Sequence, residues 1–567
     1  MVNDDWECTL GKLICWLVSA FLVSGCAQID RNTPVVSVAG NELDDRLRSI
    51  RGNPWYRQAE GAIVASTQAM ENIVLSAGAA KNIIVFVGDG MGVSTVTAAR
   101  ILEGQNLGFS GEEHSLSFDR FPFSGLVKTY NVDAQTPDSA GTMTAIMSGV
   151  KTNFGVVGVD QHVQRGNCAS QSGSELVSAL MLAEVAGMST GVISTARITH
   201  ATPAATYAVS VERNWEDISN MPVAAVDAGC EDIALQLVQF EDRLERLSGV
   251  EVDGLELALG GGRRHFLPTA VLNDPSVESD STLKAAPIEP RVGLRSDGRD
   301  LIDEWQIKYK KGRYVDTAAS LSALNPMDKG PVLGLFSDSH MRYAADRLAV
   351  INTEPSLSDM TAKGIDLLIG NPEGFFLVVE AGRIDHGHHA TSAYNALTDA
   401  VELSTAVGLA VAKTNPRETL ILVTADHGHV MTIAGYPRRG NPILGVVVPP
   451  DSDQPAQDVE GRPYTTLGYQ NGRGFQHLPG ATNADLAYAE PINAGRHDLS
   501  EVDTGSGGFH QEVLVPLAAE THSGADVAVY ASGPGAHLAT GTLEQSVLFH
   551  IMNHAANLSV RAAVAIE

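Results

Sequence analysis

Residues 83–92 of the 567-residue chain have the sequence Ile-Ile-Val-Phe-Val-Gly-Asp-Gly-Met-Gly, which is the clearest indication of the fold class. Five consecutive apolar residues indicate a strand buried on both faces, as in a parallel sheet, and the glycine-rich turn leads into a helical stretch. Asp89 stands at the carboxyl end of this strand, where open α/β sheets hold their ligands. We therefore predict an α/β fold with a large central, mostly parallel sheet flanked by helices.

Two further apolar runs end in chemically active residues in the same way. Residues 375–379 (Phe-Phe-Leu-Val-Val) lead to Glu380, and residues 420–424 (Leu-Ile-Leu-Val-Thr) lead to Asp426 and His427. The carboxyl ends of parallel strands meet at one edge of a sheet. We therefore expect these side chains and Asp89 to share one crevice.

Asp385, His389 and His522 extend this set of carboxylates and histidines. Asp385 and His389 are four positions apart, so a helix after Glu380 would place both on one face, where they can bind one ion. Aspartate and histidine suit zinc, and carboxylates with hydroxyls suit magnesium. The pattern predicts a metal centre.

Ser139 and Arg213 add a nucleophile and an anion ligand to this pattern. Pro137, Asp138 and Ser139 immediately precede a helical stretch, residues 140–147, so backbone N–H groups would face an anion beside Ser139. The planar guanidinium of Arg213 can bind two phosphate oxygens. Taken alone, Ser139 would be an ordinary helix-capping residue, but beside metals it indicates phosphoryl transfer.

Several longer strings occur in the chain in one order: V-G-D-G-M-G from Val87, D-S-A-G-T from Asp138, H-A-T-P-A from His200, R-N-W from Arg213, E-A-G-R-I-D-H-G-H-H from Glu380, T-A-D-H from Thr424 and E-T-H-S-G-A-D-V-A-V-Y from Glu520. With these strings the chain resembles the alkaline phosphatases, and the animal type more closely than the enterobacterial type. The resemblance runs from about Asn53 to Ala531. Any one string alone would be weak evidence, and their common order carries the resemblance.

The resemblance implies hydrolysis of phosphate monoesters at alkaline pH, with a phosphoserine intermediate on Ser139 and Arg213 as the phosphate clamp. It distributes the ligands over two zinc ions and one magnesium ion per subunit: Asp385, His389 and His522 for one zinc; Asp89, Asp426 and His427 for the other; Asp89, Thr202 and Glu380 for the magnesium. His388 and His429 match no ligand position. The remaining histidines are assigned to the surface or to packing: His114, His162, His265, His340, His477, His497, His510, His537, His550 and His554.

His200 and His386 stand where animal-type enzymes have histidine and the enterobacterial enzyme has aspartate and lysine. Outside the ligand set, they would tune ligand orientation and phosphate affinity, and a structurally neutral role is the alternative. Animal-type enzymes also hold calcium with a glutamate after a G-L-F strand. Ser337 takes that place here, which argues against calcium, and the nearby carboxylates Asp338 and Glu354 keep a calcium site open as the alternative.

Charge and ligand spacing bound the remaining organisation. A net charge of −28 argues against nucleic acid as a partner. Because the ligands span nearly the whole length, we predict one large α/β unit, formed by residues 81–429 and 516–567, rather than two domains. Residues 430–515 resemble the crown insertion of the animal type, and a helix from about residue 53 to 75, within residues 27–80, resembles the one that embraces the partner in related homodimers.

Residues 1–26 form a targeting segment. Residues 13–23 are apolar but too short to span a bilayer, and Val23-Ser24-Gly25-Cys26 resembles the lipobox of bacterial lipoproteins. We therefore predict an exported, periplasmic protein anchored to the membrane through a lipidated Cys26. An ordinary cleaved signal peptide is the alternative, because Lys12 is the only positive charge before the apolar run.

Cys168 and Cys230 are the only other cysteines once the targeting segment and its anchor are set aside. An even pair in an exported chain indicates a disulfide, and the positions match the first disulfide of animal-type enzymes. Two buried thiols are the alternative.

Two other classes of function remain to be weighed. Related sulfatases carry a cysteine or serine in a C/S-x-P-x-R string and nucleotide pyrophosphatases use a threonine, and residues 139–142 (Ser-Ala-Gly-Thr) fit neither. A lipoprotein that binds phosphate without turnover would not need Ser139, Arg213 and every ligand together. An aryl phosphate assay distinguishes the phosphatase from this phosphate-binding lipoprotein.

Overall fold

The computed structural model describes residues 78–269, 293–349 and 353–567, together with Pro54, Arg57 and Gly61. The predicted targeting segment with Cys26 and nearly all of the predicted helix at residues 53–75 lie outside these residues. Ala69–Glu567 forms one compact unit. This unit contains every predicted metal ligand.

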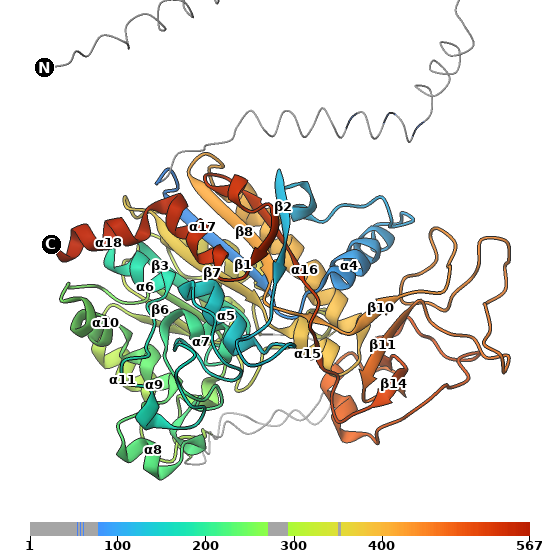
Figure 1. Cartoon of the computed structure of the whole chain (residues 1–567), viewed down its shortest axis with the longest axis horizontal. Coiled ribbons are helices and arrows are strands. Elements are labelled where there is room, and N and C mark those ends of the chain that lie inside the picture. The colour runs from blue at the N-terminus through green and yellow to red at the C-terminus, as the bar shows by residue number, and fades with distance from the viewer. Residues whose placement is uncertain (1–53, 55–56, 58–60, 62–77, 270–292, 350–352) are drawn as a thin grey trace, which may run out of the picture. The chain divides into compact units, whose positions relative to one another are not determined.

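A 10-stranded sheet in the order β17-β2-β16-β8-β1-β7-β3-β4-β6-β5 forms the centre of this unit (Figure 1). Its strands are β1 (Asn82–Gly88), β2 (Phe123–Lys128), β3 (Ser189–Arg197), β4 (Leu257–Gly261), β5 (Arg313–Val315), β6 (Val332–Leu335), β7 (Phe375–Ala381), β8 (Thr419–Ala425), β16 (Val527–Ser532) and β17 (Gly541–Glu544). All neighbours pair in parallel except β16, which is antiparallel to β2 and β8. The predicted fold class is confirmed.

The three predicted strands lie side by side in the middle of this sheet. Every residue of β1, β7 and β8 is buried, as expected for continuous apolar runs covered on both faces. In the register of the strands, Gly88 pairs with Ala381 of β7 and with Ala425 of β8. The residues that follow these strands therefore start from one edge of the sheet.

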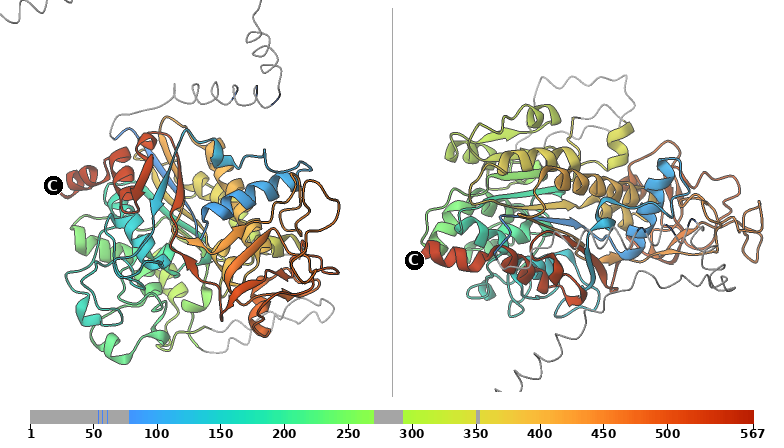
Figure 2. Two further views of the ribbon diagram at one scale, coloured as in Figure 1. Left: turned by 45° about the vertical axis from the view of Figure 1, so that its right-hand side comes forward. Right: turned by 90° about the horizontal axis from the view of Figure 1, so that it is seen from above.

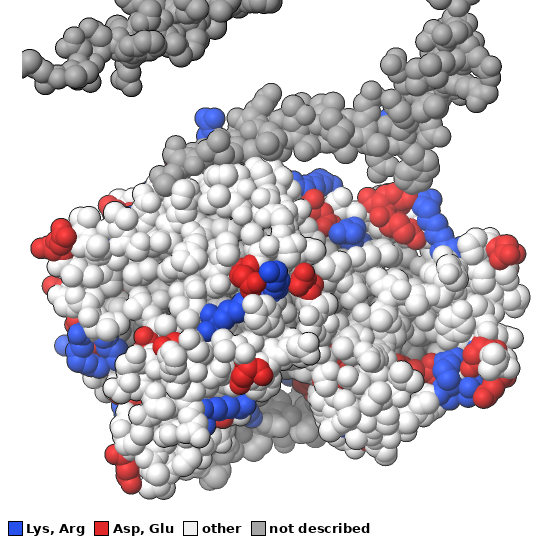
Figure 3. All heavy atoms as spheres, in the orientation of Figure 1, with Lys and Arg blue, Asp and Glu red and all other residues white. Residues whose placement is uncertain are grey.

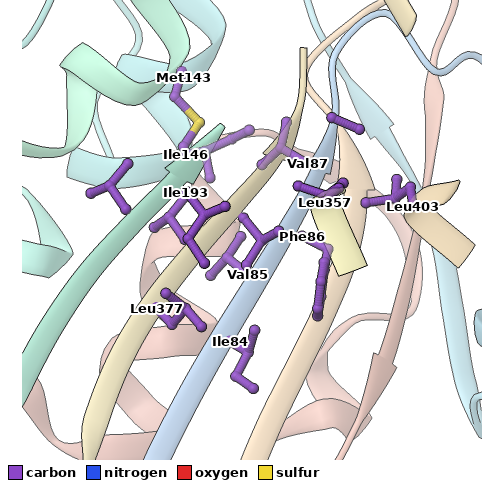
Figure 4. Close-up of a cluster of buried hydrophobic side chains, with 14 of the residues drawn as sticks. Ile84, Val85, Phe86, Val87, Met143, Ile146, Ile193, Leu357, Leu377 and Leu403 are labelled. Carbon is purple, nitrogen blue, oxygen red and sulfur yellow. The ribbon is translucent and has the colours of Figure 1, made fainter. Parts of the chain in front are cut away.

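Helices cover both faces of the sheet, as the right-hand view of Figure 2 shows. One layer contains α4 (Val93–Asn106), α14 (Leu357–Leu368) and α16 (Ala393–Lys413); the other contains α5 (Ser139–Ser148), α6 (Ala179–Val185), α7 (Ala201–Tyr207) and α17 (Val547–Ala556). In the close-up of the core, Met143 and Ile146 of α5 lie on one side of the strands, and Leu357 and Leu403 lie on the other (Figure 4). Burial of these apolar side chains is the main stabilising contribution to the fold.

The remaining α-helices of the described residues are α8 (Val223–Asp227), α9 (Ile233–Val238), α10 (Phe240–Ser248), α11 (Leu301–Lys308), α12 (Ala318–Ser322), α13 (Ala344–Ala349), α15 (Arg383–His389) and α18 (Leu558–Ile566). None of the helices in the described part of the chain combines the length and apolar character needed to cross a bilayer.

Small sheets occupy the region after β8, where the sequence loses its long apolar runs. They are built from β9 (Gly428–His429), β10 (Met431–Ile433), β11 (Leu467–Gly472), β12 (Gln476–His477), β13 (Phe509–His510), β14 (Val513–Pro516) and β15 (His522–Ser523). Strands β10, β11 and β14 form one sheet, β12 pairs with β13, and β15 pairs with β9. The last pairing places His522 opposite His429.

A disulfide joins Cys168 to Cys230 across 62 positions of sequence, as the sequence predicts. Cys230 packs in a second buried apolar cluster with residues such as Val211 and Trp215. On the surface, basic and acidic side chains are mixed and separated by wide uncharged areas on the face shown in Figure 3. The negative net charge is therefore not gathered into one patch on this face.

Candidate active site

Three strand ends place three carboxylates in the interior of the protein. Asp89 follows β1, Glu380 is the penultimate residue of β7, and Asp426 follows β8. All three residues have no solvent-exposed surface. Since the strands are neighbours in the sheet, carboxylates far apart in sequence come together, as predicted.

Asp89, Asp426 and His427 form a compact group, with one possible ligand atom from each within 4.8 Å of the others. The Nε2 atom of His427 lies 3.4 Å from Asp89 Oδ1 and 3.4 Å from Asp426 Oδ2. The backbone N–H groups of Gly90 and His427 donate to Asp426 Oδ1 at 3.0 and 2.9 Å. The turn after β1 therefore holds the carboxylate that follows β8.

Asp385, His389 and His522 form a second group, again with ligand atoms within 4.8 Å of one another. Asp385 and His389 lie on α15, one helical turn apart, and His522 arrives on β15. The Nδ1 atoms of the two histidines face backbone carbonyls, at 2.6 Å from Glu520 O and 2.8 Å from Pro137 O. These carbonyls turn the Nε2 atoms of both rings toward Asp385, at 3.2 and 3.4 Å.

His429 belongs to this second group as well, although no predicted ligand position includes it. Its Nε2 lies 2.8 Å from Asp385 Oδ1, and its Nδ1 lies 2.5 Å from Glu520 Oε2. Burial alone would lower the pKa of His429, but Glu520 and Asp385 raise it to about 10. An imidazolium that donates to two carboxylates has no free lone pair for a metal, so His429 orients Asp385.

Glu520 is a second residue that sequence reasoning missed. Its Oε1 accepts from the backbone N–H of Val430 at 2.8 Å, so its carboxylate joins the segment after β8 to β15. The only signal in the sequence was its position two residues before His522. In an extended stretch, residues two positions apart point to the same side, so Glu520 would lie on the same side as His522. This spacing does not show that Glu520 contacts His429.

Asp89, Thr202 and Glu380 supply buried oxygens without a partner in the described structure. These are Asp89 Oδ2, Thr202 Oγ1 and Glu380 Oε1. The other oxygen of Glu380 accepts a hydrogen bond from Ser194 of β3. Since buried polar atoms are nearly always paired, three orphaned oxygens from the three predicted magnesium ligands fit a hard cation.

His200 also approaches this third group, with a ring nitrogen within 4.8 Å of ligand atoms of Asp89 and Glu380. Its Nε2 lies 3.3 Å from Nη2 of Arg213. His200, His340 and His386 contact one another, with ring centroids 4.0 to 5.7 Å apart. His340 therefore packs beside the site and, in the described residues, belongs to no group of possible metal ligands.

The burial of so many like charges shifts their proton affinities. Burial, followed by repulsion from Asp426, Asp385 and Glu380, raises the pKa of Asp89 well above its usual value. Burial likewise raises the pKa of Glu380 to about 8. Carboxylates in such a cluster cannot all be charged without a nearby positive charge. The electrostatics of the site thus match the binding of multivalent cations.

Ser139 is the first residue of α5 and is buried among these groups. Its Oγ lies 3.0 Å from His427 Nε2 and 3.5 Å from Asp89 Oδ1. Asp138 caps the helix by accepting from the backbone N–H of Gly141 at 3.1 Å. The free N–H groups of the first helical turn and the helix dipole therefore favour an anion at Ser139.

Arg213 reaches the same place, where its Nη1 donates to Asp138 Oδ2 at 2.9 Å. Burial alone would raise the pKa of Asp138, but Arg213 and backbone N–H groups hold it below its usual value. This ion pair keeps the guanidinium charged and oriented in a partly buried position. The serine, the arginine and the three groups of possible metal ligands thus occupy one site.

Ser337, Asp338 and Glu354 have partners within the protein. The Ser337 hydroxyl donates to the His340 carbonyl at 2.7 Å, Asp338 accepts from Arg263 at 2.8 Å, and Glu354 accepts from the Arg342 N–H at 2.8 Å. In the described residues, no group of possible metal ligands includes Asp338 or Glu354.

Comparisons with known proteins agree with this geometry. The alkaline phosphatase family model matches residues 80–558. The chain is 43% identical over 506 residues to tissue-nonspecific alkaline phosphatase of Gallus gallus, which covers 88% of this chain and 89% of that protein. For the tissue-nonspecific enzyme of Homo sapiens the identity is 42% over 505 residues, or 88% of each protein. The predicted similarity to animal-type enzymes is confirmed.

Solved structures show the same fold. The alkaline phosphatase of Thermus thermophilus has a TM-score of 0.57 at 24% identity, over 86% of this chain and 94% of that chain. The enzyme from the Antarctic bacterium TAB5 has a TM-score of 0.51 at 20% identity, over 85% and 99%. Sequence, fold and site agree, and the chain belongs to the alkaline phosphatase family, as a metal-dependent enzyme that hydrolyses phosphate monoesters.

Proposed function

We propose that the enzyme works through a phosphoserine on Ser139. The observation that carries this proposal is the position of the Ser139 Oγ, 3.0 Å from His427 and 3.5 Å from Asp89, at the start of α5. A serine hydroxyl at neutral pH is a weak nucleophile and needs a partner that stabilises its alkoxide. A serine that only capped the helix would have no reason to face two possible metal ligands, since Asp138 is the cap.

We propose three metal sites per subunit, two for zinc and one for magnesium. The zinc ligands are Asp385, His389 and His522 at one site, and Asp89, Asp426 and His427 at the other. The magnesium ligands are Asp89, Thr202 and Glu380, whose three orphaned oxygens support this choice. When bound, these ions offset the carboxylate charge, lower the pKa of the hydroxyl and stabilise the attacking and leaving oxygens.

The protein's own groups position and transfer the phosphoryl group. The Oγ of Ser139 attacks phosphorus, the bond to the alcohol oxygen breaks, and the alcohol leaves with a proton. Water then attacks the phosphoserine, which releases inorganic phosphate and restores the hydroxyl. Throughout, the guanidinium of Arg213 and the first-turn N–H groups of α5 donate to the phosphoryl oxygens.

A two-step mechanism predicts that alcohols compete with water for the phosphoserine. We expect release of the aryl alcohol from an aryl phosphate to speed up in amino-alcohol buffers, with phosphate appearing on the buffer. Two inversions also retain configuration at phosphorus. An enzyme that inverts configuration and transfers nothing to alcohols would mean that water attacks the substrate directly.

His200 and His386 would tune the orientation of the metal ligands and the affinity for phosphate without binding a metal themselves. The contact of His200 with Arg213 supports the role in phosphate affinity. We propose no calcium at Ser337, because Asp338 and Glu354 are engaged by arginine and backbone groups.

Residues 430–515 would form a crown-like insertion over a homodimer interface. Measurement of the molar mass in solution tests the dimer.

We further propose that the enzyme is exported to the periplasm and anchored as a lipoprotein, on the basis of Val23-Ser24-Gly25-Cys26. Cys26→Ser should then move the protein from the membrane fraction to the soluble fraction. A wild-type protein that is already soluble would contradict the lipid anchor.

A further inference from the structure

Three carboxylates gather at the edge of the main sheet that is remote from the catalytic strand ends. Glu184 lies in the last turn of α6, Glu256 directly precedes β4, and Asp253 lies three residues earlier. One oxygen from each lies within 4.8 Å of the others. The group sits at the amino ends of β3 and β4, whereas the catalytic residues follow the carboxyl ends of their strands.

Glu184 is the buried member of this group, with 3% of its surface exposed. Its Oε2 accepts from the Thr190 hydroxyl at 2.6 Å, while its buried Oε1 has no hydrogen-bond partner in the described structure. Glu256 is held beside it, because its Oε2 accepts from the Thr190 N–H at 2.7 Å. Glu184 therefore presents an unsatisfied oxygen close to two other carboxylates.

No ion pair within the described ranges joins these three carboxylates to a basic side chain. Asp253 and Glu256 line a surface cavity of about 590 Å³, which Lys308, Lys310 and Lys311 also line. Lys308 is engaged elsewhere, at 2.9 Å from Asp242 and 3.4 Å from Glu241. The group is thus open to solvent through Asp253, and in the described part of the chain it has no ion pair with a basic side chain.

Three neighbouring carboxylates without a cation are costly to keep ionised. Burial, followed by repulsion from Glu256, raises the pKa of Glu184 well above its usual value, and burial with repulsion from Asp253 raises that of Glu256 to about 7. Either protons or a cation must offset this charge near neutral pH. A proton is shared between two carboxyl groups at most, whereas one cation can bind oxygens of all three residues.

We propose that Glu184, Asp253 and Glu256 bind a calcium ion. The donors are oxygens only, which suits a hard cation and not zinc, and the exposed side leaves room for the water ligands that complete calcium coordination. The ion would tie the last turn of α6 to the loop before β4, so its effect is on stability. The site is separate from Asp338 and Glu354 and does not depend on the proposed catalytic mechanism.

Calcium binding is tested on the full chain with its zinc and magnesium loaded. The protein is dialysed into buffer freed of calcium with a chelating resin, at constant zinc and magnesium, and then titrated with CaCl₂. We expect the wild type to bind calcium and to unfold at a higher temperature as it saturates. Glu184→Gln and Glu256→Gln should each bind one calcium fewer per chain and lose the thermal shift.

Glu251→Gln is the matched control, because Glu251 lines the same cavity but is outside the three-carboxylate group. It should keep the calcium and the thermal shift, and all three variants should keep the phosphatase activity. In the absence of calcium, Glu184→Gln and Glu256→Gln should each be at least as stable as the wild type, since each removes a charge that repels the neighbouring carboxylates. The proposal would be overturned if Glu184→Gln bound as much calcium as the wild type. It would also be overturned if Glu251→Gln lost as much calcium binding as Glu184→Gln.

Discussion

Ser139 and its neighbours show how single residues acquire their chemistry from buried surroundings. Asp138, the residue before it, both caps α5 and holds Arg213, so one carboxylate orients the helix start and the guanidinium. His429 similarly spans Asp385 and Glu520. A side chain that two partners already hold in place loses little further conformational entropy when substrate binds. This is what makes a site preorganised.

Replacing Ser139 by alanine should lower the rate of aryl phosphate hydrolysis by about a hundredfold or more, because water must then attack the substrate directly. The metal content, measured by elemental analysis, should stay unchanged, since Ser139 is outside the proposed ligand set. Ser148→Ala, at the other end of α5, is the control and should keep the rate. A Ser139→Ala enzyme with the wild-type rate would rule out the serine as the nucleophile.

Thr202→Val should weaken magnesium binding by about tenfold or more and leave the zinc content intact, because it removes one of the three orphaned oxygens. Without metals, the variant should unfold at slightly higher denaturant, since an unsatisfied buried hydroxyl costs about 1–3 kcal/mol. Thr206→Val, one turn later on α7, is the control, because its hydroxyl donates to Pro203 O at 2.7 Å. Unchanged magnesium affinity in Thr202→Val would exclude this ligand.

At the level of elements, the long helix α16 places a buried carboxylate against α13. Asp399 accepts from the Ala344 N–H at 3.0 Å, and burial raises its pKa to about 7 against the opposing effects of Arg347 and Arg383. Since the folded state holds the proton more tightly than the unfolded state, the free energy of unfolding falls as pH rises from about 4 to about 7.

Asp399→Asn should remove this part of the pH dependence, because the amide keeps an oxygen for Ala344 but does not ionise. The variant should therefore be more stable than the wild type above pH 7, as measured by denaturant midpoints across a pH series. Asp366→Asn, whose carboxylate lies on the half-exposed surface of α14 beside Lys413, is the control. Parallel curves for the wild type and Asp399→Asn would contradict the raised pKa.

The disulfide joins two connections outside the main sheet. A loop of 62 residues closed by a crosslink is expected to stabilise the folded state by about 4 kcal/mol through loss of chain entropy in the unfolded state. The double variant Cys168→Ser with Cys230→Ser should show a correspondingly lower denaturant midpoint and lose activity faster on heating. Stability equal to the wild type would mean that the apolar cluster around Trp215 holds these connections without the crosslink.

Across the whole molecule, strands from distant parts of the chain converge on one charged centre. Chelation should abolish phosphatase activity and also lower the melting temperature, because buried carboxylates then repel one another or must take up protons. Zinc with magnesium should restore both properties, and zinc alone should leave the Thr202 and Glu380 site incomplete. Full activity in metal-free protein would contradict the metal assignment.

Much of this architecture could be predicted because it depends on contiguous stretches of sequence. The apolar runs of β1, β7 and β8 each end in a site residue, and these residues come together as soon as the three strands are parallel neighbours. The antiparallel strand β16 was harder to predict, because its buried and half-buried residues alternate and its direction depends on which neighbours it pairs with. The contact of His340 with His386 was beyond the sequence for a similar reason, since only the fold brings the two rings together.

The α/β class, the strand-end carboxylates, the serine at a helix start and the family could all be predicted before the structure, because each depends on local order along the chain. The bridge that His429 forms between Asp385 and Glu520 depends on the fold, because the three residues come from separate segments and the β9–β15 pairing brings the segments of His429 and Glu520 together. The fold also leaves Glu184 Oε1 without a hydrogen-bond partner in the described residues, beside Asp253 and Glu256. Burial and the lack of an ion-pair partner there are properties of assembled neighbours, which no single stretch of sequence contains.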